Sequence, residues 1–265
     1  MRLATIVLDG ASRVAVVRDD RVLPAAPDLG MRALAADPDA VASLRSWASL
    51  QHAGAGLSVA DVAFGPVVPD PGAIYTVGLN YDGPGASPRP PAPLIYGKAS
   101  SAVAGHGATL AWDRSVTDDV DAEIELGVVI GHDGGVFGYT CINDVSARDE
   151  HLDGDQWLLG KSMAGFCPVG PWLVTADAFD PTDVGLGARI SGEPIQDGRT
   201  SQLRFDIPAI LAHLGRHLTL RPGDLIATGT PVRLSTPPGP TRRLRAGDTV
   251  TVWVEGIGEL TTHIA

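Results

Sequence analysis

Two glutamates, Glu123 and Glu125, stand two positions apart at the start of an apolar run that ends at Ile130. A strand over residues 124–130 alternates its side chains between two faces, so both carboxylates lie on one face with Cα atoms about 6.6 Å apart. Like charges this close repel each other unless water or a cation lies between them, and Mg²⁺ and Ca²⁺ prefer carboxylate oxygens. The pair therefore predicts either a hard-metal site or a solvated face of the strand.

A second group of ionisable residues follows in the stretch 143–151. A helix that starts near Asp144 would bring Asp144, Arg148 and His151 onto one face, because these positions are separated by four and then three residues. An acid, a guanidinium and an imidazole would then point the same way. The alternative is a helix N-cap followed by ion pairs on the surface.

The cations of the chain are strongly biased, with 18 arginines and only two lysines, Lys98 and Lys161. If lysines that arginine can replace have been lost, the two that remain are those whose compact ammonium a planar guanidinium cannot replace. Chance retention of two lysines would give the same pattern. Lys161 does not belong to a phosphate-binding P-loop, because Asp155 stands where that motif has Gly. A serine-hydrolase elbow also fails, because Ala164 occupies the place of its second Gly.

A third candidate is the Thr-Gly-Thr-Pro stretch at 228–231, which follows an apolar run. Two hydroxyls and the backbone N–H groups around a Gly suit the anionic head of a ligand. An ordinary turn at the end of a strand has the same residue types.

The elements that must position these residues are mostly strands separated by Gly and Pro turns. Three prolines between residues 66 and 71 cannot continue a helix or a central strand, so they separate a small N-terminal domain, 1–65, from a large domain, 66–265. Residues 82–93 hold five prolines, which predicts a loop that acts as a mobile lid. The remaining pattern predicts strands over 3–8 and 13–18, a helix from Asp37-Pro38 to about His52, and a helix over 206–217.

The 265 residues carry a net charge of −11 and are 44% hydrophobic, which excludes an intrinsically disordered chain. No apolar run reaches the roughly 18 residues of a membrane span, and the basic footprint of a nucleic-acid binder is missing. We therefore expect no nucleic-acid partner and no membrane, while a small anionic substrate remains open if cations reverse the field locally. Two cysteines without a CxxC motif and the lack of a signal peptide predict a cytoplasmic protein.

Taken in order, several stretches of the chain resemble the fumarylacetoacetate hydrolase superfamily, from about residue 70 to the end. That superfamily includes acylpyruvate hydrolases, oxaloacetate decarboxylases, and the isomerases and decarboxylases of homoprotocatechuate breakdown. The matching motifs are VGLNY at 77–81, EIEL at 123–126, NDVSARD at 143–149, GKS at 160–162, PVGP at 168–171 and TGTP at 228–231.

The resemblance implies an α+β, β-rich fold, a mixed β-roll with a small N-terminal α/β unit, which forms a homodimer. It also implies a divalent metal, Mg²⁺ or else Mn²⁺ or Ca²⁺, and a small anionic keto-acid substrate. By the match of motifs, the metal ligands are Glu123, Glu125 and Asp144, the catalytic cations are Lys161 and Arg148, and the substrate-binding residues are Tyr81, Lys98 and Thr230.

The chain departs from the family at the lid. Family hydrolases continue from Asn-Tyr into a His, with a Glu three residues later, and this pair activates the attacking water. Pro84 and Ser87 stand at these positions, so the chain resembles a divergent member that lacks the lid His/Glu pair. His151 stands where the family often has Gln, and Arg233 stands where it has Gly after Thr-Gly-Thr-Pro-x.

The resemblance thus implies a metal-dependent enzyme that acts on a 2-oxo acid or 1,3-dicarbonyl substrate through a metal-bound enolate. The first hypothesis is C–C bond hydrolysis of the acylpyruvate type, with His151 or His106 as the relocated base. The second is isomerase or decarboxylase chemistry, which needs no base for water. The third is a non-catalytic keto-acid binder.

Overall fold

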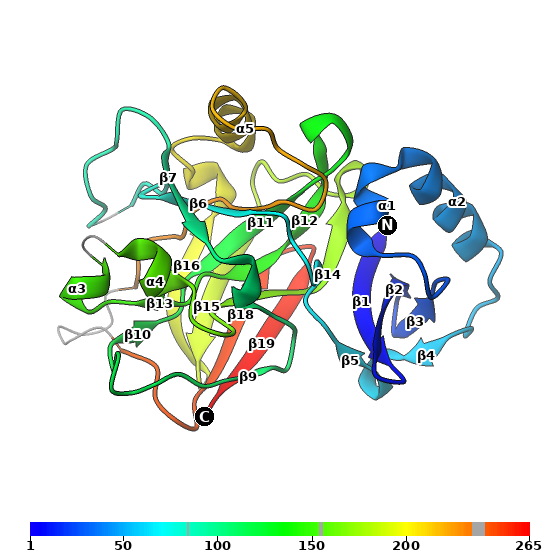
Figure 1. Cartoon of the computed structure of the whole chain (residues 1–265), viewed down its shortest axis with the longest axis horizontal. Coiled ribbons are helices and arrows are strands. Elements are labelled where there is room, and N and C mark those ends of the chain that lie inside the picture. The colour runs from blue at the N-terminus through cyan, green and yellow to red at the C-terminus, as the bar shows by residue number, and fades with distance from the viewer. Residues whose placement is uncertain (84, 154–155, 235–241) are drawn as a thin grey trace.

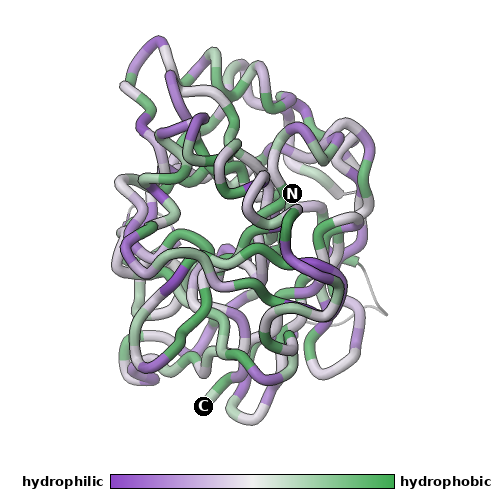
Figure 2. Tube along the Cα trace, turned by 90° about the vertical axis from the view of Figure 1, so that its right-hand side faces the viewer, coloured by the Kyte–Doolittle hydropathy of each residue, from purple (hydrophilic) through white to green (hydrophobic). Residues whose placement is uncertain are grey.

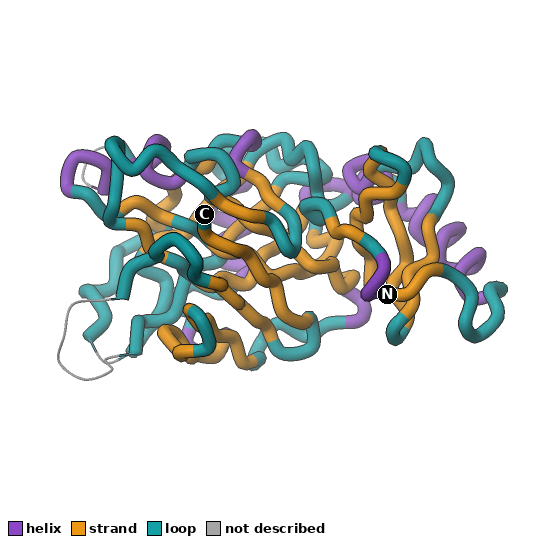
Figure 3. The backbone as a smooth tube through the Cα atoms, turned by 90° about the horizontal axis from the view of Figure 1, so that it is seen from below, coloured by secondary structure: helices purple, strands orange, loops and turns teal. Residues whose placement is uncertain are grey.

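The computed structural model describes residues 1–83, 85–153, 156–234 and 242–265. Strands form the middle of the molecule and helices lie mostly at its periphery (Figure 3). The predicted β-rich α+β fold is confirmed. In the described part of the chain, no helix is long and apolar enough to span a membrane. Pro84, one of the two altered lid positions, lies outside the described residues.

The N-terminal residues form a meander of strands with two helices, drawn in blue in Figure 1. The predicted N-cap of the second helix is confirmed, because the Asp37 carboxylate accepts from the N–H groups of Asp39 and Ala40. The first strand also pairs with a strand of the large domain, so one sheet joins both parts, and the boundary at 65/66 stays a prediction. These elements are β1 (Arg2–Leu8), β2 (Ala11–Arg18), β3 (Arg21–Pro24), α1 (Met31–Ala36), α2 (Pro38–Ser49), β4 (Leu57–Ser58) and β5 (Ala63–Phe64).

The large sheet runs through the whole molecule in the order β4-β3-β2-β1-β14-β12-β11-β17-β6-β7, with β5 and β8 paired to it at β1 and β14. Its strands are mostly antiparallel, but β17 and β6 run parallel, as the mixed β-roll requires. Beyond the N-terminal unit its members are β6 (Ile74–Gly78), β7 (Leu94–Lys98), β8 (Val103–Ala104), β11 (Ile124–Ile130), β12 (Val136–Asn143), β14 (Cys167–Thr175) and β17 (Leu225–Ala227).

A second sheet packs against β11, β12 and β14 in the order β16-β15-β18-β19-β9. The remaining elements include a two-stranded ladder, β10 with β13, and three helices. The ladder lies beside α3 and α4, away from the N-terminal unit (Figure 1). All of these elements are β9 (Thr109–Leu110), β10 (Val120–Asp121), β13 (Ser146–Ala147), α3 (Glu150–Asp153), α4 (Trp157–Lys161), β15 (Gly185–Ile190), β16 (Glu193–Arg199), α5 (Ile207–Gly215), β18 (Thr249–Val254) and β19 (Gly258–Ile264).

The predicted alternation along β11 holds, and it explains where the core lies. Leu126 and Val128 pack with Val252 of the second sheet, whereas Val129 packs toward the N-terminal helices. Hydrophobic stretches accordingly follow the strands through the middle of the molecule, and hydrophilic stretches mark many outer loops (Figure 2). Because β11 is buried along its whole length, the carboxylates at its N-terminal end are held on a rigid element.

The predicted helix that starts near Asp144 is wrong. The chain stays extended there, with Ser146–Ala147 paired to β10, and α3 begins only at Glu150. The reason is tertiary, since the Val145 N–H donates to the Phe166 carbonyl and the Arg148 N–H to the Asp119 carbonyl. These distant acceptors replace the i−4 carbonyls that a helix would use.

Candidate active site

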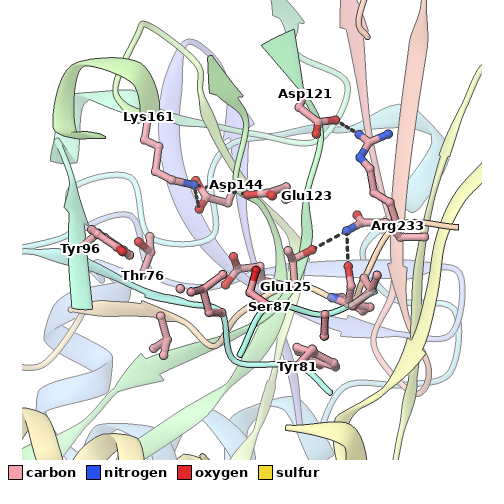
Figure 4. Close-up of a pocket in the computed structure, with 18 of the residues that line it drawn as sticks. Thr76, Tyr81, Ser87, Tyr96, Asp121, Glu123, Glu125, Asp144, Lys161 and Arg233 are labelled. Atoms are coloured by element: carbon pink, nitrogen blue, oxygen red, sulfur yellow. Dashed lines mark hydrogen bonds and ion pairs between the residues drawn. The ribbon is translucent and has the colours of Figure 1, made fainter. Parts of the chain in front are cut away.

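A pocket of about 340 Å³ opens between the large sheet, the β10–β13 ladder, α4 and the loop after β6. The close-up in Figure 4 shows acidic side chains in its middle, Lys161 on one side and Arg233 on the other. Seven of the nine predicted site residues line it, namely Tyr81, Glu123, Glu125, Asp144, Arg148, Lys161 and Thr230.

The three predicted metal ligands converge in this pocket. Glu123, Glu125 and Asp144 each offer one carboxylate oxygen, and these atoms all lie within 4.8 Å of one another. The antiparallel register of β11 and β12 produces this convergence, and the Asp144 N–H donates to the Glu123 carbonyl at 2.8 Å. Three carboxylate oxygens at this spacing suit a hard divalent cation such as Mg²⁺, Mn²⁺ or Ca²⁺.

Burial makes these carboxylates unequal. Glu125 is 3% exposed, and burial together with the charge of Asp144 raises its pKa well above the usual range. Burial also acts to raise the pKa of Asp144, but the ammonium groups of Lys161 and Lys98 outweigh it and lower that pKa to about 2. Asp144 is thus a permanent anion, while Glu125 needs a proton or a cation to be stable where it lies.

Both lysines of the chain meet on one carboxylate. Lys98 Nζ lies 2.5 Å from one oxygen of Asp144, and Lys161 Nζ lies 2.6 Å from the other. Lys161 also donates to Ser146 Oγ at 2.7 Å and approaches Glu123 at 3.4 Å. An ammonium has three donors on one atom, so it fits a site where three acceptors surround one point.

Lys98 is placed differently from the prediction. Its Nζ bonds to Asp144 and to the Val145 carbonyl, and the side chain lies behind Asp144 rather than on the wall of the pocket. No described contact supports direct binding of substrate by Lys98, so that role stays a prediction, and the contact it does make orients Asp144.

Arg148 also contacts this group of acidic side chains. Its guanidinium bonds to Glu123 and lies 3.3 Å from an oxygen of Asp153 and 3.8 Å from one of Asp121. Burial acts to lower the pKa of Arg148, but the charges of Glu123 and Asp153 outweigh it and raise that pKa. Arg148 therefore stays a cation and holds Glu123 in place.

The Thr-Gly-Thr-Pro turn at 228–231 forms another part of the pocket wall. Gly229 has a φ of +106°, and a Cβ there would come within 2.7 Å of the Cβ of Asn80, so the turn requires glycine. The Gly229 N–H donates to Glu125 at 2.5 Å, and Thr230 Oγ1 accepts from Gln196 Nε2 at 2.7 Å. The turn thus fixes Glu125 and presents the Thr230 side chain at the pocket.

Tyr81 supplies a neutral donor. Its hydroxyl is buried and has no hydrogen-bond partner among the described residues. Burial, helped by the charge of Glu125, raises the pKa of Tyr81 above its usual value. The phenol therefore stays protonated at neutral pH, and its O–H is available to an oxygen that enters the pocket.

The histidines lie elsewhere. His151 is exposed on α3 and does not line the pocket, because the extended chain at 144–149 replaces the helix that would have aligned it with Asp144. His106 lies against the Phe64 ring and accepts from the Thr261 N–H. Of the described residues, none that lines the pocket is a histidine. The expected alignment of His151 with the acidic group is thus wrong, and its catalytic role stays an untested prediction.

The sequence reasoning missed the residue that holds the altered lid. The Arg204 side chain is only 3% exposed and gathers the loop after β6, donating to the Asp82 carboxylate at 2.8 Å and to the carbonyls of Leu79 at 2.9 Å and Ser87 at 2.6 Å. Described residues of 82–93 form no helix or strand, as predicted, but Arg204 anchors their first half. No local sequence pattern indicates this contact, because it joins residues more than 115 positions apart.

Two further features complete the pocket. The rings of Tyr96 and Trp157 stack with centroids 3.8 Å apart and form an aromatic wall on the side of Lys161. Asp121 lies on the opposite side against Arg233 (Figure 4). The alternation that aligned Glu123 with Glu125 also places Asp121 on their face, so the sequence did carry a signal for it.

Comparison with known proteins agrees with this site. Residues 73–265 match the family described as fumarylacetoacetate (FAA) hydrolase C-terminal. The chain belongs to this family. A relative of this fumarylacetoacetate hydrolase family member, an uncharacterized protein of Staphylococcus aureus (strain USA300), is 36% identical over 222 residues, which cover 79% of this chain and 74% of that protein.

Solved structures extend the similarity over the whole chain of this family member. Maleylpyruvate hydrolase from Sphingobium sp. SYK-6, in complex with manganese(II) and pyruvate, has a TM-score of 0.81 and 28% identity, covering 100% of this chain and 99% of that chain. The 5-carboxymethyl-2-hydroxymuconate delta-isomerase from Mycobacterium smegmatis has a TM-score of 0.77 and 30% identity, with coverage of 100% and 99%. Similar structures therefore include a hydrolase and an isomerase, one of them with a divalent metal.

Replacing one carboxylate tests the metal site. Glu123→Gln should weaken binding of Mn²⁺ by at least about 10-fold. Loss of a residue that only hydrogen-bonds a metal ligand already costs about 10- to 100-fold in metal affinity, and a direct ligand matters no less. Titration calorimetry measures it, and Glu259→Gln, an exposed carboxylate on β19, is the matched control. Equal Mn²⁺ affinity in the two variants would contradict the assignment.

Replacing Arg204 tests the anchored lid. Arg204→Gln removes the charged donors that hold the loop, so amide hydrogen exchange in residues 79–89 should speed up by about 10-fold or more. Arg199→Gln, which removes an exposed guanidinium from β16, should leave that exchange unchanged. An unchanged exchange rate in Arg204→Gln would mean that other contacts hold the loop.

Proposed function

We propose that this protein is a divalent-metal-dependent enzyme that stabilises the enolate of a small 2-oxo acid or 1,3-dicarbonyl compound, with decarboxylation as the favoured outcome, because isomerisation would also require a group that removes a proton from carbon. The observation that carries the proposal is the make-up of the pocket. Three carboxylates converge as a hard-metal site beside Lys161 and Arg148, and no described residue of the wall is an imidazole.

The residues present fit the metal, since the ligand set is all carboxylate. A divalent metal held by Glu123, Glu125 and Asp144 supplies Lewis-acid stabilisation of negative charge on a substrate oxygen. The chain's own groups add to it. Lys161 keeps a positive charge beside the three carboxylates, and its pKa is raised because Asp144 and Glu123 outweigh the effect of burial.

Tyr81 and Thr230 complete the binding of an anionic substrate. The Tyr81 hydroxyl is the buried donor without a protein partner, and it can hydrogen-bond an oxygen whose charge increases as the enolate forms. The Thr230 hydroxyl, oriented by Gln196, lies on the wall where a carboxylate can accept from it. Arg148 holds Glu123 and adds a second cation to the pocket.

The missing base decides between reaction classes. Hydrolysis of a C–C bond requires a group that takes a proton from water, and a histidine is the usual choice near neutral pH. Decarboxylation of a β-keto acid needs no such group, because the electron pair of the broken C–C bond becomes the enolate and CO₂ leaves. Electrostatic stabilisation, which this pocket provides, is then the main requirement.

Hydrolysis is the second candidate, favoured by the similarity to maleylpyruvate hydrolase. It would require His151, or another group, to reach the pocket during the reaction. A homodimer, and Mg²⁺ rather than Mn²⁺ or Ca²⁺ as the bound metal, stay predictions.

The products decide between the two candidates. The protein with Mg²⁺ or Mn²⁺ is incubated with oxaloacetate and with an acylpyruvate, and products are identified by mass spectrometry. We expect loss of CO₂ from oxaloacetate, no hydrolysis of the acylpyruvate, and only a mild effect of His151→Ala. Cleavage of the acylpyruvate to pyruvate and a carboxylic acid, with a loss of about 10²- to 10⁴-fold in His151→Ala, would instead establish hydrolysis.

Lys161→Arg tests the need for a compact cation. We expect a loss of about 10²-fold or more in turnover, because the guanidinium cannot place its charge where Lys161 Nζ meets Asp144, Ser146 and Glu123. Arg199→Lys, on the exposed surface, is the matched control. Turnover near that of the wild type would show that the lysine is retained by chance.

A further inference from the structure

One cation of the pocket has no role in the chemistry described above. Arg233 lines the wall opposite Lys161, at a position where the resemblance described above led us to expect glycine (Figure 4). Its backbone is fixed by a β-bridge to Gln196, and the next N–H, of Leu234, donates to the Ile195 carbonyl. The backbone of Arg233 is therefore held in place, and its side chain adds a cation to the wall of the pocket.

Arg233 shares its counterion with two other arginines. Among the described residues, Asp121 is the carboxylate that contacts Arg233, and it also meets Arg148 and Arg243, which have further acidic partners in Glu123, Asp153 and Asp119. Burial and the charge of Arg243 lower the pKa of Arg233 to about 10. A desolvated cation with a shared counterion gains from any further anion placed beside it.

The hydrogen-bonding capacity of Arg233 is also only partly used. Its terminal nitrogens reach the carbonyls of Arg242 and Ala122 only at 3.3 Å, and Nε is buried with no partner among the described residues. A guanidinium has five donors in a planar fork that matches the two oxygens of a carboxylate. Arg233 thus has both the charge and the donors for a carboxylate ligand.

The charge of the pocket as a whole points the same way. Four acidic and four basic side chains line it, so their formal charges cancel. A divalent cation at the three carboxylates would leave the pocket with two positive charges. A substrate with one carboxylate neutralises half of that charge, and a substrate with two neutralises all of it.

We propose that Arg233 is a specificity residue, which binds an anionic group at the end of the substrate that lies away from the three carboxylates. The inference rests on the proposed function for the other end of that substrate. The distance is suitable for a short diacid, because Asp121, the partner of Arg233, is two residues from Glu123, at most about 7 Å between Cα atoms.

Binding measurements without turnover test this inference separately from the reaction. Two five-carbon acids differ only at the far end, 2-oxoglutarate with a carboxylate and 2-oxopentanoate with a methyl group. The Mn²⁺-loaded wild type should bind 2-oxoglutarate at least about 10-fold more tightly by calorimetry, as expected for a charged hydrogen bond in a desolvated site. Arg233→Gln should abolish that preference and leave the affinity for 2-oxopentanoate unchanged.

The matched control is Arg243→Gln, which removes another cation from Asp121 but does not touch the pocket, and it should keep the preference. Arg233→Gln leaves Asp121 paired with Arg148 and Arg243, so the fold should survive. If it does not, Arg233→Lys, which keeps the charge but loses the planar fork, should weaken binding of 2-oxoglutarate alone.

A wild type without preference, or a preference kept in Arg233→Gln, would overturn the role of Arg233 even if the enzyme turns over a keto acid. Loss of the preference in a protein that gives no product would support Arg233 and contradict the proposed reaction. A Mn²⁺-loaded wild type that binds neither acid would contradict both.

Discussion

The site depends on keeping two carboxylates, Glu125 and Asp144, side by side with almost no access to water. Taking such charges out of water costs several kcal/mol each unless partners compensate. The protein compensates unevenly, with two ammonium groups on Asp144 and a single backbone N–H on Glu125. The negative charge that remains around Glu125 is what a divalent cation would match, so the electrostatic imbalance itself defines the binding site.

That imbalance can persist only on a scaffold that does not relax. Glu125 lies on a strand that is buried on both faces, between the second sheet and the N-terminal helices. Its neighbour β12 delivers Asp144 by register, and the glycine turn at 228–230 approaches closely enough to donate to Glu125. The apolar core therefore contributes to function by preventing the carboxylates from turning toward water.

The parts of this arrangement that depend on local pattern could be predicted from the sequence. The period of two along 124–130 and the cap at Asp37 are signals within a few residues, and both agree with the structure. The helix expected over 144–149 does not form, because the carbonyls of Phe166 and Asp119, from distant segments, accept hydrogen bonds from N–H groups of this stretch. Arg204 was missed for the same reason, since its acceptors lie on a loop far away in sequence.

Two departures from the family pattern then act on one pocket. At the lid, the loop without its His/Glu pair is held by the buried Arg204, so it can cover the site without contributing a proton acceptor. At the opposite wall, Arg233 brings a guanidinium where the resemblance led us to expect glycine. If the reaction is the one we propose, the loop supplies no imidazole and Arg233 supplies positive charge, so both features suit a pocket that binds anions and stabilises an enolate.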